Sequence, residues 1–195
     1  AVLTNVIGST NVIKSSIEHK VKSFVGLSTD KSVYPINVMG MTKALMEKTA
    51  LNFSKQKNLK TKINIVRYGN VMLSRGSVIP LFVSQIRNNQ KVTITDKNMT
   101  RFSITLTEGV KFVNECLRLM QGGEIFVPKI PSYNILTLAN ALAPKCKIKY
   151  TGIRSGEKIH EEMITTADAH LTLNFKKYFV ILPDLETYKN YSNKY

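Results

Sequence analysis

The chain has 195 residues, a length that fits one ordinary domain or most of one with a small appendage. It is 43% hydrophobic and 21% charged, which excludes a largely disordered chain because enough apolar surface is present to form a packed core. Its 28 basic and 13 acidic residues give a net charge of +15, which suits an anionic small ligand or a nucleic acid.

The first half of the chain alternates between helical and extended patterns. Apolar residues recur at helical spacing over residues 2–18, and residues 23–30 (SFVGLSTD) form a short β-prone run. Asn37 can cap a helix over about residues 38–54, and residues 63–71 (INIVRYGNV) read as a second buried strand. Strand, helix and strand at this spacing predict a right-handed βαβ unit, whose ligands bind beyond the carboxyl ends of the strands.

The predicted helix over residues 38–54 has an expected buried face. Its apolar pattern places on that face Val38, Met41, Leu45, Met46, Thr49 and Phe53. The charged residues Lys43, Glu47 and Lys48 are expected on the remaining surface.

The second half of the chain is less regular. We predict helices over residues 77–88 and 106–120, and strands over residues 124–129 and 147–152. These elements suggest a small mixed lobe beside the sheet. Residues 188–195 (YKNYSNKY) have no apolar period and are predicted to fray.

A glycine-rich first turn would be needed for a complete dinucleotide-binding sheet, since it admits the pyrophosphate to a helix N-terminus. No G-x-G-x-x-G pattern or close variant occurs in the sequence. Either the chain is not a dinucleotide-binding enzyme, or the first half of that fold lies upstream of residue 1.

Several other kinds of protein find little support. The apolar run from Val78 to Val83, broken by Pro80, is too short for a bilayer span, and the start of the chain lacks a secretory pattern, so a cytoplasmic location is expected. Cys116 and Cys146 lie far apart, and no metal site is expected. The basic residues are mostly dispersed lysines, which argues against nucleic-acid binding.

A cluster of reactive side chains follows the first predicted strand. Thr29, Asp30 and Lys31 place a hydroxyl, a carboxylate and an ammonium group side by side, and Lys43 follows from the next helix. Removing water from a sugar next to a ketone needs an acid and a base, and Asp30 and Lys31 have these capacities if the site tunes their pKa values. Taken alone, the same three residues would more often form a solvated turn.

The segment around this cluster, residues 27–43 (LSTDKSVYPINVMGMTK), resembles the active-site segment of extended short-chain dehydrogenases that act on UDP-N-acetylglucosamine. The resemblance continues, in order, over nearly the whole chain, through RYGNV (67–71), SRGSVIPLF (74–82), ITDKNMTRF (94–102), GGEIFVPKIPS (122–132) and GIRSGEKIHEEMI (152–164). Chance agreement at six separate blocks does not account for it.

The resemblance implies a 4,6-dehydratase reaction with NADP, or alternatively NAD, as cofactor. Hydride would leave sugar C4, water would be eliminated across C5 and C6, and the hydride would return to C6. By position, Lys31 would be the base at C5 and Asp30 the acid at the C6 hydroxyl. Thr29 would hold the 4-hydroxyl, and Lys43 would bind the nicotinamide ribose.

One residue departs from the family pattern. The usual catalytic Tyr lies four residues before the helix Lys, and here that position is Met39. A thioether cannot exchange a proton, so the C4 hydroxyl needs another base. Asp30 is the first candidate and Tyr34 the second.

The resemblance also implies contacts to the cofactor and to the substrate. Ser28, Tyr68 and Gly69 would lie near the nicotinamide. The diphosphate and ribose of a UDP-sugar would be held by Asn70, Arg101, Arg154 and Glu157, with arginine suited to phosphate by its fixed charge and forked donors.

The predicted fold is therefore α/β, the C-terminal part of a Rossmann-type parallel sheet with a small mixed substrate lobe, lacking the first strands and the Gly-rich turn. Residues 1–75 would be the later part of the NADP-binding domain, 76–187 the lobe with returning Rossmann elements, and 188–195 a disordered tail. Inversion at C5 is favoured, and a homo-oligomer is expected at full length. A retaining dehydratase, a UDP-sugar 4-epimerase, an inactive fragment and a basic nucleic-acid-binding module remain alternatives.

Overall fold

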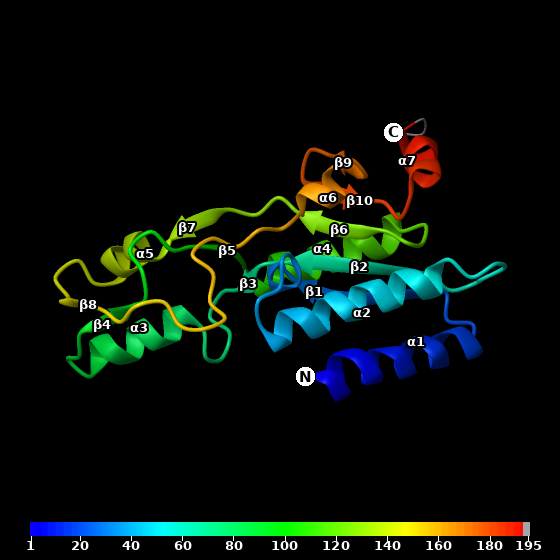
Figure 1. Ribbon diagram of the computed structural model, residues 1–195. Helices are drawn as coiled ribbons and strands as arrows, with labels where there is room; N and C mark the ends of the chain where they lie inside the picture. Colours follow the sequence, from blue (N-terminus) through cyan, green and yellow to red (C-terminus); the bar gives the residue numbers. More distant parts are fainter. Residues whose placement is uncertain (193–195) are drawn as a thin grey trace. The chain divides into compact units, whose positions relative to one another are not determined.

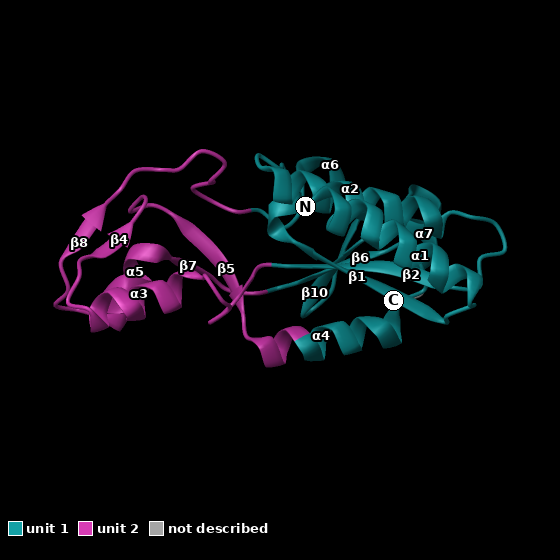
Figure 2. Ribbon diagram, turned by 90° about the horizontal axis from the view of Figure 1, so that it is seen from below, with its two compact units in different colours: residues 1–68, 110–129, 162–195 teal, residues 69–109, 130–161 magenta. Residues whose placement is uncertain are grey.

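The computed structural model describes residues 1–192, which form two compact units (Figures 1 and 2). Unit 1 contains Ala1–Tyr68, Val110–Lys129 and the chain from Glu162 onward, and unit 2 contains Gly69–Gly109 and Ile130–Glu161. The chain first changes unit between Tyr68 and Gly69, whereas the sequence predicted a boundary between residues 75 and 76.

Unit 1 is built on a five-stranded sheet with strand order β1-β2-β6-β10-β9. Strands β1, β2 and β6 are parallel, and β10 runs antiparallel to both β6 and β9. The strands span Ser23–Thr29 (β1), Lys62–Tyr68 (β2), Ile125–Pro128 (β6), Thr172–Asn174 (β9) and Tyr178–Ile181 (β10). The predicted strand–helix–strand unit is thus present, and the carboxyl ends of β1 and β2 meet at one edge, where Thr29 pairs with Tyr68.

The helices of unit 1 cover both faces of its sheet. They are η1 (Val2–Gly8), α1 (Ser9–Glu18), the short η2 (Asp30–Ser32), α2 (Val38–Ser54), α4 (Leu106–Leu119, which starts in unit 2), α6 (Thr166–Ala169) and α7 (Leu185–Ser192). Helix α2 has the predicted bounds and the predicted cap, since the Asn37 side chain accepts a hydrogen bond from the Gly40 amide at 2.9 Å.

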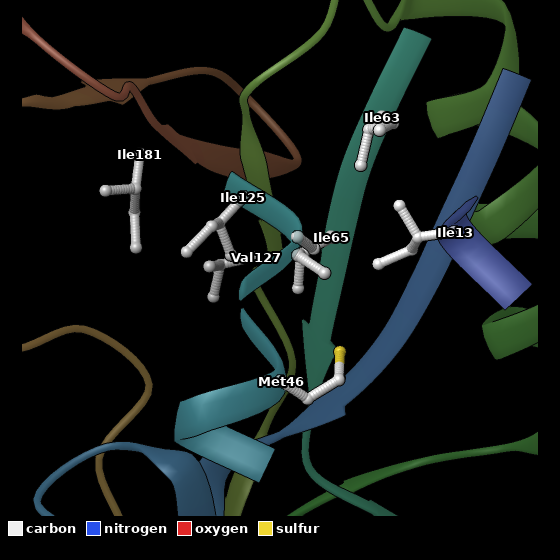
Figure 3. Close-up of a cluster of buried hydrophobic side chains, with 8 residues drawn as sticks. Ile13, Met46, Ile63, Ile65, Ile125, Val127 and Ile181 are labelled. Atoms are coloured by element: carbon white, nitrogen blue, oxygen red, sulfur yellow. The ribbon is translucent and has the colours of Figure 1, made fainter. Parts of the chain in front are cut away.

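Strand β2 carries apolar side chains to both faces of the sheet, as expected for a parallel strand buried on both sides. Ile63 and Ile65 join Ile13 of α1 and Met46 of α2 in one cluster (Figure 3), while Val66 belongs to a second cluster with residues of α4. Full burial of each such side chain contributes roughly 1.5–3 kcal/mol. These two clusters fix the strand whose end carries Tyr68.

Unit 2 has two small sheets and two helices. Strand β5 pairs in parallel with β3 and antiparallel with β7, and β4 pairs in parallel with β8. The elements span Asn70–Val71 (β3), Val78–Arg87 (α3), Val92–Ile94 (β4), Thr100–Ile104 (β5), Ser132–Asn134 (β7), Ile135–Leu142 (α5) and Ile148–Tyr150 (β8). Phe82 of α3 and Ile135 of α5 share its buried core with Ile94.

The buried face of α2 differs from the prediction. Met46 is buried as expected, but Val38, Met41 and Leu45 are each more than half exposed. The buried residues are instead Gly40, Thr42, Met46, Glu47 and Ala50. Apolar residues occur around most of this helix, so the orientation is set by close contact at Gly40 and by polar pairing at Glu47, both described below.

The end of the chain also differs from the prediction. Residues 188–192, expected to fray, belong to α7, and residues 193–195 of the predicted tail lie outside the described residues. The buried Tyr191 donates its hydroxyl to Glu124, a fully buried carboxylate that also accepts the amides of Gln121 and Gly122. This contact ties the last helix to the core.

We expect Tyr191→Phe to lower the free energy of unfolding by about 1–3 kcal/mol, because it leaves a buried carboxylate short of one donor. The matched control is Tyr188→Phe in the same helix, whose hydroxyl makes no hydrogen bond within residues 1–192. The check is the midpoint of urea unfolding. Equal midpoints for the two variants would show that the Glu124 contact does not hold α7.

Candidate active site

Three predicted catalytic side chains meet at the carboxyl end of β1. Oδ1 of Asp30 accepts a hydrogen bond from Thr29 Oγ1 at 2.8 Å and contacts Lys31 Nζ at 2.9 Å. Asp30 is fully buried, and its second oxygen, Oδ2, makes no hydrogen bond within the described residues. An unpaired buried carboxylate oxygen is costly, so a ligand hydroxyl that reached Oδ2 and donated to it would relieve that cost.

The turn that carries Asp30 and Lys31 packs directly on α2. At Gly40 an added Cβ would collide with the carbonyl oxygen of Lys31 and would lie 3.1 Å from its carbonyl carbon. Only a residue without a side chain therefore allows the helix to approach the turn this closely.

We expect Gly40→Ala to destabilise the fold by about 1–3 kcal/mol, the usual cost of overpacking, although alanine is the better helix former. Gly109→Ala, in helix α4, is the control, because a Cβ there meets no atom within 4 Å. Its helix propensity alone predicts a gain of up to about 1 kcal/mol. Thermal unfolding of both variants tests this. If Gly40→Ala is as stable as Gly109→Ala, the turn at Lys31 can shift to make room for the added Cβ.

Lys43 lies beside the strand that leads to this turn. Its Nζ donates to the Leu27 carbonyl at 2.9 Å, which places the ammonium group next to the last residues of β1. Burial lowers the pKa of Lys43, and the negative charge of Glu47 acts in the opposite direction. A lysine here can donate hydrogen bonds to neighbouring hydroxyls, as the predicted contact with a ribose requires.

Met39 stands at the position of the usual catalytic Tyr, and Tyr34 is one of the candidates to replace that Tyr as a base. The surroundings of these two residues differ. Met39 is 40% exposed on the first turn of α2. The hydroxyl of Tyr34 is bound to Thr166, accepting its amide at 2.8 Å and donating to its Oγ1 at 3.2 Å. As a proton acceptor, Tyr34 would first have to leave this contact, whereas Asp30 Oδ2 has no competing partner among the described residues.

A buried ionic network behind the turn was missed by the sequence reading. Glu47 and Arg67 are 2% and 3% exposed, and Arg67 Nη2 lies 2.7 Å from Glu47 Oε2. Ser28, predicted to contact the cofactor, is buried and donates to Glu47 Oε1 at 2.5 Å. The available signal was Arg67 within a strand predicted to be buried, since a buried arginine requires a buried anion.

The four predicted substrate residues line one pocket within unit 2. Besides Asn70, Arg101, Arg154 and Glu157, the wall includes Ser77 at the start of α3, Tyr133 and apolar side chains of the unit 2 core. Two arginines and one carboxylate give the lining of this pocket a net positive charge. Such a mixture of apolar wall, fixed cations and hydrogen-bonding groups suits a phosphorylated nucleoside.

The charged side chains of this pocket are oriented by hydrogen bonds and ion pairs to other residues of unit 2. Arg101 Nη1 donates to the carbonyls of Thr100 at 2.7 Å and Ile159 at 3.2 Å, and its Nη2 lies 4.0 Å from Glu157. Glu157 in turn accepts the Arg154 amide at 3.2 Å. The guanidinium of Arg101 is thereby preorganised for an anion.

The remaining predicted residues lie at the ends of β2 and β3. Burial raises the pKa of Tyr68, so its phenol stays protonated. A Cβ at Gly69 would lie 2.6 Å from Phe102 Cβ, so the backbone packs tightly against β5. Asn70 donates to the Phe102 carbonyl at 3.0 Å.

No helix within residues 1–192 is both long enough and apolar enough to cross a membrane. The same residues contain no group of three or more His, Cys, Asp or Glu side chains arranged to hold a metal ion.

Two curated relatives carry different activities in their names. The chain is 48% identical over 187 residues to the UDP-N-acetylglucosamine 4,6-dehydratase (inverting) of Campylobacter jejuni strain 81-176, covering 94% of this chain and 55% of the relative. It is 42% identical over 200 residues to the UDP-glucose 4-epimerase of Rickettsia canadensis, covering 92% and 59%. The chain thus spans little more than half the length of these relatives.

Solved structures show the same fold. Pen from Bacillus thuringiensis matches with a TM-score of 0.88 and 37% identity, over 93% of this chain and 60% of that one. DesIV, a dTDP-glucose 4,6-dehydratase from Streptomyces venezuelae with NAD and TYD bound, matches with a TM-score of 0.73 at 18% identity, over 86% and 59%, which concerns the fold alone. The predicted α/β, Rossmann-type class is confirmed.

The family comparison agrees with the resemblance that the sequence blocks indicated. A family model described as polysaccharide biosynthesis protein matches residues 1–183. This match covers the turn at Asp30, the helix with Lys43 and the pocket with Arg101 and Arg154. The chain therefore belongs to the polysaccharide biosynthesis protein family.

Proposed function

We propose that this chain is part of a nucleotide-sugar 4,6-dehydratase that converts UDP-N-acetylglucosamine to its 4-keto-6-deoxy derivative with inversion at C5. The observation that carries the proposal is the buried Asp30, whose Oδ1 contacts Lys31 while Oδ2 is left without a partner within residues 1–192. The 48% identity to a relative named as the inverting dehydratase supports the substrate and the stereochemistry.

The proton movements assigned to the turn balance. Thr29 orients the 4-hydroxyl of the sugar, and Asp30 takes its proton through Oδ2 as C4 becomes a ketone. Lys31 removes the C5 proton, which the adjacent ketone acidifies, and Asp30 passes its proton to the C6 hydroxyl as that group leaves as water. When the hydride returns to C6, C5 would take up a solvent-derived proton on the opposite face and Lys31 would release its proton to solvent, so that both side chains regain their starting states. One carboxylate thus serves as base and then as acid, which fits the absence of a phenol at Met39.

A nicotinamide dinucleotide, when bound, would supply a reversible acceptor for the hydride of C4. The donor set beside β1 fits its nicotinamide ribose, because Lys43 Nζ lies at the Leu27 carbonyl in a groove lined by Gly8 and Gly26. We propose NADP, with NAD as the alternative, since the solved structures of DesIV and of a dTDP-glucose 4,6-dehydratase from Bacillus anthracis contain NAD. The phosphate-binding glycine turn is not part of this sequence.

We assign the nucleotide part of the substrate to the pocket of unit 2. Arg101 and Arg154 would contact the diphosphate, Asn70 would donate to it, and Glu157 would accept a ribose hydroxyl. Two contacts support this assignment. Backbone carbonyls orient the Arg101 guanidinium, and the Arg154 amide donates a hydrogen bond to Glu157.

A UDP-sugar 4-epimerase is the second candidate, favoured by relatives that bear that name at 42% identity. The two activities differ at C6, because an epimerase leaves the C6 hydroxyl in place. The test is to incubate the full-length protein with UDP-N-acetylglucosamine and NADP and to examine the product by NMR. A 6-methyl group next to a C4 ketone is expected, and a product that keeps its C6 hydroxyl would contradict the dehydratase.

A further inference from the structure

The carboxylate of Glu47 (α2) is hydrogen-bonded to both sides of the turn that carries Asp30 and Lys31. We call Glu47, Ser28 and Ser32 the clamp. Oε1 of Glu47 accepts the Ser28 hydroxyl at 2.5 Å and lies 2.7 Å from the Ser32 hydroxyl. These two serines directly flank the segment from Thr29 to Lys31. All three residues of the clamp are buried.

Ser32 also closes the turn itself. Its hydroxyl lies 2.6 Å from the Thr29 carbonyl, so its one proton is shared between that oxygen and Glu47. The end of β1 and the end of the short helix η2 are thus held to the same point of α2. The intervening Asp30 has little freedom to move relative to Lys43, which lies one helical turn before Glu47.

Arg67 of β2 neutralises Glu47 and extends the clamp. Its Nε and Nη2 donate to the Glu47 carboxylate at 3.1 and 2.7 Å, and its Nη1 donates to the Met163 carbonyl at 2.8 Å. The segment that follows Met163 contains Thr166, the partner of Tyr34. The loop after the turn is therefore anchored to the same segment that Arg67 holds.

A buried ion pair is weak evidence for a gain in stability, because desolvation offsets most of the attraction between the charges. Here the pair has three further hydrogen-bond partners, Ser28, Ser32 and Met163, which place the catalytic turn and its neighbouring loop. Asp168 Oδ2 also lies 4.0 Å from Arg67 Nη1. Misplacing a reactive group by about 1 Å can lower a rate by about a hundredfold.

We propose that Glu47, supported by Arg67, is a positioning residue that fixes the Asp30–Lys31 turn for proton transfer through Ser28 and Ser32. The inference rests on the proposed dehydratase function. Glu47 acts through the serines and takes no proton from the substrate. Its loss would therefore slow the chemical step while leaving the affinity for the UDP-sugar nearly unchanged.

The test compares Ser32→Ala, the double variant Ser28→Ala/Ser32→Ala and Glu47→Gln in the full-length protein. We expect kcat to fall about tenfold for Ser32→Ala and about a hundredfold for the other two, with KM changed less than about twofold. Ser54→Ala is the matched control, since this serine lies at the other end of α2 and, within residues 1–192, donates only to the Leu51 carbonyl at 2.7 Å. It is expected to keep the kcat of the unaltered protein.

The serine variants remove single hydroxyls and keep the assay informative if Glu47→Gln does not fold. Unchanged kcat in the double variant would overturn the positioning role, and so would a rise in KM without a fall in kcat. An unaltered protein that makes no 4-keto-6-deoxy product would refute the proposed function itself, which separates the two failures.

Discussion

Replacing Lys31 by Met is expected to abolish the elimination of water, lowering turnover by about a hundredfold to ten-thousandfold, the range that general base catalysis supplies. Lys31 is the only amine that contacts the buried Asp30 among the described residues, with Nζ 2.9 Å from Oδ1. Methionine keeps much of the length of the side chain but cannot accept the C5 proton. Some oxidation at C4 should persist and be visible as reduced-nicotinamide absorbance.

The readout that isolates this step is exchange at C5. In deuterated solvent the unaltered protein should place deuterium at C5 of the sugar, and Lys31→Met should not. Lys22→Met, just before the start of β1, is the control and should exchange normally. Deuterium at C5 in a folded Lys31→Met protein would assign the base to another group.

Replacing Arg154 by Ala is expected to weaken UDP-sugar binding about a hundredfold, the effect of losing a charge-assisted contact to phosphate of a few kcal/mol. Dinucleotide affinity should change little, because Arg154 lines the pocket that we assign to UDP. Isothermal titration of both ligands provides the comparison. Arg87→Ala, at the end of α3 and outside the pocket wall, is the matched control.

An equal loss of affinity for both ligands would count against the placement of the diphosphate. A loss of the same size in Arg87→Ala would show that general positive potential, not the pocket, attracts the substrate. Raising the salt concentration separates these cases further, since screening weakens long-range attraction more than a direct ion pair.

The reactive cluster was predictable from local sequence order, whereas the pocket residues were predictable only from the resemblance to a known family. Thr29, Asp30 and Lys31 follow directly on a short apolar strand, and the carboxyl ends of parallel strands gather at one edge of a sheet. The four pocket residues came from motif resemblance alone. Their meeting in one wall agrees with that assignment, while their roles remain proposals.

The orientation of α2 and the clamp behind the turn were not predictable by periodicity. Val38, Met41 and Leu45 give this helix a second apolar stripe, so the pattern cannot choose between faces. The choice depends on contacts between distant positions, such as Glu47 with Arg67 and Gly40 with Lys31. Similarly, Tyr191 pairs with Glu124, a partner that composition at the end of the chain could not reveal.

We propose that oxidation at C4, loss of water across C5 and C6, and reduction at C6 occur in one turnover at the Asp30–Lys31 turn. The most direct measurement supplies full-length protein with UDP-N-acetylglucosamine deuterated at C4 and locates the label in the product. We expect deuterium at C6 of a 4-keto-6-deoxy sugar, with no net consumption of NADP. Deuterium accumulating in reduced cofactor, or remaining at C4 of a product that keeps its C6 hydroxyl, would contradict it.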